Sequence, residues 1–132
     1  MENQLSITCI SCPMGCPLTV IMDSGKVKDV SGAVCKKGID YAELECTNPT
    51  RMVCSTVTLT GSHLRRMPIK TERAIPKHKI AECIKSLKGI EIEAPVKIGD
   101  VVVENICGTG INMVATRRAS TSYFCPNALF HE

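Results

Sequence analysis

The sequence contains very few aromatic residues: two tyrosines, two phenylalanines and no tryptophan in 132 residues. No stretch approaches the run of about 18 apolar residues that a transmembrane helix needs, so we expect no membrane span. The first residues, MENQLSITCISC, lack the basic and apolar regions of a secretory signal peptide. Because aromatic residues are so few, the core must rest on Val, Ile, Leu and Met. Because no signal peptide is evident, we expect a cytoplasmic protein with reduced thiols.

Cysteine, in contrast, is abundant, with nine residues in a chain of one domain's length. A secreted disulfide framework would give an even number, so the odd count favours thiols that are available to metal. Cys9, Cys12 and Cys16 lie on a Gly- and Pro-containing loop, and Cys35 follows after 18 residues. Three thiolates on one irregular loop can wrap three corners of a cubane cluster, and the fourth must come from elsewhere. This spacing predicts a [4Fe–4S] cluster.

Two other interpretations of these cysteines stay open. A zinc ribbon has two Cys-x2-Cys knuckles, and Cys9 and Cys12 form one, but Cys35 has no partner two or three positions away. A zinc-stabilised interaction module without a redox role is the first alternative. A regulatory protein that senses oxidation through Cys9 or Cys12 is the second. The other five cysteines lack paired spacing, and we expect four core residues and one incidental tail thiol: Cys46, Cys54, Cys83, Cys107 and Cys125.

Basic residues concentrate in residues 63–88, with eight Lys or Arg against two Asp or Glu. This basic segment is either a solvated helix face or a docking surface for an acidic partner. No aromatic residue interleaves its charges, which argues against binding of single-stranded nucleic acid, and we expect no nucleic-acid partner. No Ser/His/Asp or Cys/His arrangement is evident, so the sequence gives no sign of substrate chemistry in this chain.

The hydrophobic patterns predict an α+β fold: a small antiparallel β-rich domain with two short helices and an N-terminal Cys-rich cluster-binding loop. Residues 18–22 and 26–30 flank Asp23-Ser24-Gly25, which is typical of a β-hairpin. Residues 36–46 and 76–88 are the predicted helices. Their expected buried residues are Ile39, Ala42, Leu44 and Cys46 in the first, and Ile80, Cys83, Ile84 and Leu87 in the second. Further strands are expected at 5–8, 52–60, 68–71, 90–94, 101–106 and 111–115.

The expected organisation is a single domain over residues 1–117. It comprises a cluster-binding subregion at 1–46 and a β-rich subregion at 50–117. Beyond residue 117 the pattern fades, so 118–132 is predicted to be a loosely ordered tail.

Several segments together resemble the small bacterial DUF1667 family over about residues 7–117: TCISCPMGC, VCKKGIDYAELE, NPTR and APVKIGDVVVENICGTGINMVATR. The opening is also similar to the N-terminal 4Fe–4S domain of molybdopterin oxidoreductases, where a lysine follows the remote cysteine. Lys37 is the matching residue, and the resemblance places it beside the cofactor. The 18-residue gap before Cys35 is shorter than in those enzymes and no pterin-binding domain follows, so molybdenum chemistry is not expected.

The DUF1667 resemblance also implies partners. Members of the family accompany an FAD-dependent dehydrogenase similar to glycerol-3-phosphate dehydrogenase, and a second flavoprotein subunit. The resemblance therefore implies an iron–sulfur electron-transfer subunit of a flavin-dependent dehydrogenase complex, with substrate chemistry in the partner.

Overall fold

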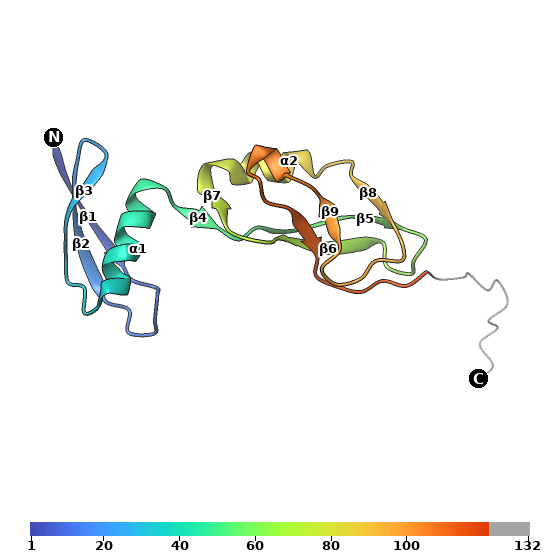
Figure 1. The fold of residues 1–132 in the computed structure, drawn as a ribbon, viewed down its shortest axis with the longest axis horizontal. Coiled ribbons are helices and arrows are strands. Elements are labelled where there is room, and N and C mark those ends of the chain that lie inside the picture. Colours follow the sequence, from blue (N-terminus) through green and yellow to red (C-terminus); the bar gives the residue numbers. More distant parts are fainter. Residues whose placement is uncertain (122–132) are drawn as a thin grey trace. The chain divides into compact units, whose positions relative to one another are not determined.

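The computed structural model describes residues 1–121. The protein has an α+β fold built mainly from antiparallel strands (Figure 1). The chain divides into two compact units, Met1–Thr50 and the chain from Arg51 onward. The sequence predicted one domain over 1–117 with subregions 1–46 and 50–117. The structure divides between Thr50 and Arg51, close to the start of the predicted second subregion. Each unit has its own hydrophobic core.

The first unit contains a three-stranded antiparallel sheet and one helix (Figure 1). Its strands are β1 (Glu2–Thr8), β2 (Pro17–Asp23) and β3 (Lys26–Ser31), with β2 in the centre, and α1 spans Lys36–Thr47. The predicted hairpin is confirmed. Its turn residues Ser24 and Gly25 both have positive φ, 50° and 80°, as a two-residue turn of the twist-matching type requires.

The core of this unit is small. Its buried apolar residues are Cys9, Leu18, Val20 and Ala42. Helix α1 buries only Gly38 and Ala42, which lie one turn apart on the same face. A Cβ at Gly38 would lie 3.2 Å from the Ala33 Cβ, so the helix can approach closely there.

The sequence predicted four buried residues in α1, and only Ala42 is fully buried. Ile39 and Leu44 are 39% and 49% exposed, and Cys46 is half-buried. The reason is that the helix contacts its unit through its smallest side chains, Gly38 and Ala42, and the larger apolar residues flank that stripe.

The second unit contains a five-stranded sheet in the order β8-β5-β6-β10-β9. These strands are β5 (Cys54–Thr60), β6 (Arg66–Thr71), β8 (Glu91–Glu93), β9 (Val101–Val103) and β10 (Met113–Ala115). The β5–β8 pair is parallel, and the other pairs are antiparallel. Two short strands, β4 (Thr50–Arg51) and β7 (Ile75–Pro76), pair with each other.

The predicted second helix is shorter than 76–88. A 3₁₀ turn, η1 (Lys77–Lys79), leads into α2 (Ile80–Ser86), and a second 3₁₀ turn, η2 (Ile106–Gly108), precedes β10. Cys83 and Leu87 are buried as predicted, whereas Ile84 is 38% exposed. Ile80 is partly buried against the same core.

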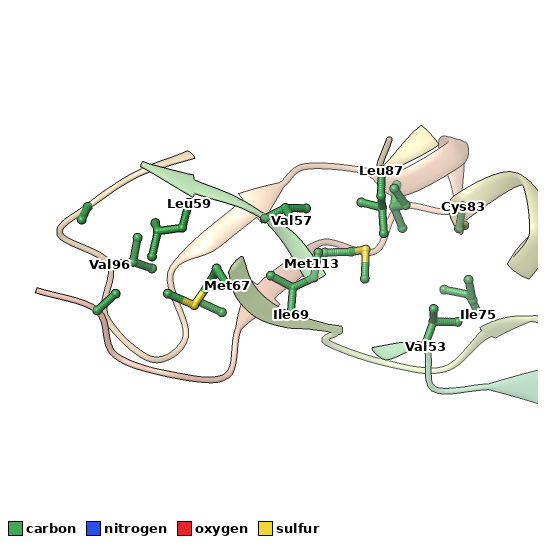
Figure 2. Packing of buried hydrophobic residues seen from close by; sticks show 14 residues of the cluster. Val53, Val57, Leu59, Met67, Ile69, Ile75, Cys83, Leu87, Val96 and Met113 are labelled. Atoms are coloured by element: carbon green, nitrogen blue, oxygen red, sulfur yellow. The ribbon is translucent and has the colours of Figure 1, made fainter. Parts of the chain in front are cut away.

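The second core lies between the sheet and α2, and it is aliphatic and sulfur-containing throughout the described residues (Figure 2). Met67, Ile69 and Met113 are almost completely buried on neighbouring strands, and Cys83 lies beside Leu87 at the helix. At about 25 cal/mol per Å², the burial of such side chains is the main stabilising term. No fully buried residue within 1–121 is aromatic, and Tyr41 packs partly buried against the first core.

The ordered chain extends past the predicted boundary at Arg117. Ala119 is 2% exposed, and it forms a β-bridge with Val96 in which each backbone N–H donates to the other's carbonyl. Ala119, which lies within the predicted tail, is therefore packed into the second unit. The predicted tail beyond residue 121, with Cys125, lies outside the described residues.

Candidate metal centre

All four predicted cluster ligands lie at one end of the sheet in the first unit. The loop 9–16 joins β1 to β2, whose facing residues are Thr8 and Pro17. The last residue of β3, Ser31, pairs with Thr19 near the start of β2. The loop 9–16 and the segment 32–35 therefore leave the sheet at the same end, and α1 begins immediately after Cys35. Antiparallel pairing brings Cys35 to this end although it is remote in sequence.

Two backbone contacts bring these segments close together. The Cys9 N–H donates to the Cys16 carbonyl oxygen at 2.9 Å, which closes the base of the loop 9–16. Gly32 has a φ of +87°, and a Cβ there would lie 2.2 Å from the Pro17 carbonyl oxygen. Only glycine allows this approach. Since Cys35 is three residues further on, its Cα lies within about 11 Å of Gly32.

The four cysteines differ in exposure. Cys9 is buried, Cys12 and Cys16 are half-buried, and Cys35 is exposed. No disulfide links them. Within residues 1–121 the structure contains no group of three or more His, Cys, Asp or Glu side chains arranged to hold a metal ion. The structure thus brings the predicted ligands to one end of the unit but does not gather their thiols.

This end of the unit is positively charged. Cys35 is the N-cap of α1 without a side-chain cap, and the first turn contains no acidic residue. Lys36 and Lys37 occupy that turn and are exposed. A helix N-terminus carries positive partial charge and normally attracts Asp or Glu. Two ammonium groups at this position are unfavourable unless an anionic group lies nearby.

Exposed apolar side chains lie on the same two segments. Ile10 and Met14 in the loop 9–16 are 71% and 72% exposed, and Val34 beside Cys35 is 76% exposed. Isolated exposed apolar residues are ordinary on protein surfaces. Here three of the most exposed large apolar residues of the described chain flank the predicted ligands.

The remaining cysteines only partly follow the prediction of core residues. Cys83 is fully buried, Cys46 and Cys107 are half-buried, and Cys54 is exposed at the start of β5. Burial, with the nearby Glu45 carboxylate, raises the pKa of the Cys46 thiol. The proximity of Cys107 to the helix that holds Cys83 could not be predicted, because no local spacing in the sequence signals a contact between α2 and η2.

The basic segment 63–88 spreads over β6, η1 and α2. Arg66 donates from Nε to the Thr56 hydroxyl at 2.7 Å and from Nη2 to the Thr56 carbonyl at 3.0 Å. Arg65, Lys85 and Lys88 are exposed. Arg66 therefore serves the β5–β6 pairing in addition to contributing charge.

The fold and the cysteine-bearing end define a small α+β protein with a candidate thiolate metal site. Residues 36–117 match the family described as "Protein of unknown function (DUF1667)", and the chain belongs to this family. The match begins one residue after Cys35, so all four predicted ligands precede it. Among curated proteins, none matches.

One solved structure resembles this chain, the NMR structure of a Clostridium perfringens protein determined as a structural genomics target. It is 23% identical, its TM-score is 0.51, and the alignment covers 63% of this chain and 95% of that one. This likeness supports the fold alone. No helix in residues 1–121 is both long and apolar enough to cross a membrane.

Proposed function

We propose that this chain is an iron–sulfur electron-transfer subunit of a flavin-dependent dehydrogenase complex. The observation that carries the proposal is the position of Cys9, Cys12, Cys16 and Cys35 on two segments at one end of one sheet. Four thiols from sequence-distant segments are the donor set that a cubane cluster requires. When bound, a [4Fe–4S] cluster would supply one-electron exchange.

The residues at this end fit an anionic group of that kind. Lys36, Lys37 and the α1 N-terminus offset the negative charge of four thiolates. Gly15, with a φ of +62°, and the neighbouring Pro13 place the loop 9–16 outside regular structure, as thiols approaching from different directions require. The thiols of this loop must still move together, so ligand binding and ordering of the loop would be coupled.

Lys37 has a second role in this proposal. An ammonium near the site favours the more negative, reduced form of any redox group held there. Replacing Lys37 by Gln is therefore expected to lower the reduction potential. Lys26 is the first residue of β3, at the end of the strand opposite to the segment that holds Cys35, so Lys26→Gln is a matched control that leaves the potential unchanged.

The partner in this proposal is an FAD-dependent dehydrogenase similar to glycerol-3-phosphate dehydrogenase, together with a second flavoprotein subunit. Ile10, Met14 and Val34 provide an apolar surface around the ligand segments on which such a protein could dock and exclude water. A flavin releases electrons singly or in pairs, which suits a one-electron carrier. Substrate chemistry then belongs to the partner.

The test is anaerobic purification and reconstitution of the full chain, with iron, sulfide and zinc assays and absorbance near ~400 nm, where thiolate-to-iron charge transfer absorbs. We expect about four irons per chain and bleaching by dithionite. Cys35→Ser should lose this signal, whereas Cys54→Ser should keep it, because Cys54 is an exposed thiol outside the site.

A colourless protein with one zinc would identify the zinc-stabilised module and overturn the electron-transfer proposal. A metal-free protein after reconstitution would overturn both. Co-purification of a flavoprotein with the wild-type chain supports the assigned partner. Its absence from an anaerobic native extract that still yields the iron-loaded chain would overturn that assignment.

A further inference from the structure

Cys83 and Cys107 form a thiol pair in the second unit, outside the candidate metal centre. Cys83 lies in α2 and Cys107 in η2, and the Ser86 hydroxyl contacts both residues, as donor to the Cys83 carbonyl oxygen and as neighbour of the Cys107 sulfur. Cys83 is completely buried beside Leu87 and Ile75 (Figure 2). Cys107 is half-buried and packs against the same core. One thiol of the pair is therefore sealed and the other reaches solvent.

Polar contacts fix the two elements around this pair. The Cys107 thiol lies 3.6 Å from the Ser86 hydroxyl oxygen, and that hydroxyl donates to the Cys83 carbonyl at 2.7 Å. Lys79 Nζ donates to the Cys107 carbonyl oxygen at 3.2 Å. These contacts join α2 and the end of η1 to η2, so the two cysteines lie on elements that are held together.

The backbone of the turn also holds Cys107 in place. Cys107 has a φ of 50° and a ψ of 33°, a left-handed conformation that residues other than glycine rarely adopt. Such conformations persist where the surroundings enforce them, and they are enriched at functional sites. No atom lies within 4 Å of a Cβ built at Gly108 or Gly110, so the turn is open to a small reagent beside Cys107.

The two thiols have unequal chemistry. The pKa of Cys83 is raised to about 11, mainly because the side chain is buried. The neighbouring Cys107 thiol and the Glu82 carboxylate also raise this pKa, whereas the Lys79 ammonium lowers it. Cys83 is therefore protonated at neutral pH and inaccessible. It cannot begin a reaction with an external reagent, but it lies where it can complete one.

We propose that Cys83 and Cys107 form a two-electron dithiol site that exchanges with low-molecular-weight disulfides. The Cys107 sulfur attacks the external disulfide RSSR, which forms a mixed disulfide Cys107–S–S–R and releases one RSH. The Cys83 sulfur then displaces the second R group, which leaves as RSH with the proton of the Cys83 thiol. Two thiols of the chain are oxidised to one disulfide and one RSSR is reduced to two RSH.

The test uses the full chain, reduced, treated with a chelator and then exposed to oxidised glutathione, quenched with N-ethylmaleimide and digested with trypsin. Trypsin leaves Cys83 in peptide 80–85 and Cys107 in peptide 98–117, each as the sole cysteine. We expect these two peptides to be cross-linked, with a loss of about 2 Da for the two hydrogens removed. Dithiothreitol should reverse the change.

Variants separate the two roles. Cys83→Ala should stop at a mixed disulfide, with glutathione retained on Cys107. Cys107→Ser should give no cross-link and leave Cys83 unmodified, because its side chain is buried. Cys46→Ser is the matched control, a half-buried cysteine of the other unit, and should form the cross-link at the wild-type rate. Circular dichroism confirms that each variant is folded.

The proposal is overturned if the wild-type chain keeps glutathione on Cys107, or if other cysteines are modified while peptides 80–85 and 98–117 stay reduced. It is also overturned if Cys83 is modified as fast in Cys107→Ser as in denatured protein, since the pair would then lack a buried partner.

Discussion

The glycine that brings the segment 32–35 against β2 allows a quantitative test. Gly32→Ala places a Cβ 2.2 Å from the Pro17 carbonyl oxygen, which belongs to the backbone and cannot rotate away. It also puts alanine at a φ of +87°, a conformation that costs an L-residue about 1–2 kcal/mol. Overpacking adds about 1–3 kcal/mol. The first unit should therefore lose about 2–5 kcal/mol of stability.

Gly25→Ala is the matched control. Gly25 has a φ of +80° and nothing within 4 Å of a built Cβ, so it should lose only the conformational part, about 1–2 kcal/mol. The difference between the two variants isolates the contact with Pro17. Gly25 lies in the hairpin turn at the other end of β2 and β3, so Gly25→Ala leaves the segment that holds Cys35 in place.

The assay is the alkylation rate of Cys9 in the metal-free chain, read from the modified peptide. Cys9 is 5% exposed, so its reaction requires the first unit to open. At about 1.4 kcal/mol per tenfold change, Gly25→Ala should speed alkylation roughly 5- to 30-fold. Gly32→Ala should speed it at least about 30-fold. Equal rates in the two variants would refute the tight approach of Gly32 to Pro17.

Two predictions concern the second unit. Thr71 is buried and its hydroxyl accepts the Val53 N–H at 3.1 Å, so Thr71→Val should lower the free energy of unfolding by about 1–3 kcal/mol by leaving that donor unpaired. Thr71→Ser, which keeps the hydroxyl, should lose about 1 kcal/mol for the methyl group, and a wild-type denaturant midpoint for Thr71→Val would contradict the bond. The pKa of Cys83 is raised from 9.0 to about 11, so its stabilising contribution is fully present below pH 9 and is lost as pH rises towards 11. Unfolding followed across that range should fall less steeply with pH in Cys83→Ala than in the wild type, and identical slopes would argue against the shift.

Local signals in the sequence predicted the elements that depend on neighbouring residues. The turn Asp23-Ser24-Gly25 indicated the hairpin because Gly25 adopts positive φ without steric cost, and Ser24 also has a positive φ in the structure. The apolar spacing predicted α2, although its first turn is 3₁₀. Both elements are formed by residues that are close together in the sequence, so a local pattern is enough to predict them.

Features set by long-range contacts were not predictable in this way. The parallel pairing of β5 with β8 depends on residues far apart in the chain, and so does the contact of Cys107 with Ser86 in the helix that holds Cys83. The exposure of Ile39 and Leu44 follows from which face of α1 meets the sheet. That face is selected by the close approach at Gly38, and hydrophobicity alone does not reveal it.

The candidate ligands show the same division. Spacing alone suggested that Cys9, Cys12 and Cys16 belong together, and the hairpin accounts for the return of Cys35 to their end of the sheet. The convergence of the four thiols stays a prediction, because it depends on how the loop 9–16 closes.

The four-residue core of the first unit has a consequence for the life of the protein in a cell. A segment of about 50 residues with so little buried apolar surface is near the lower size limit for a domain that folds unaided. A bound metal group would then supply much of its folding free energy. If the proposed iron–sulfur cluster is that group, proteases would encounter the open form most often when iron is scarce, and the cellular amount of this chain would follow the iron supply.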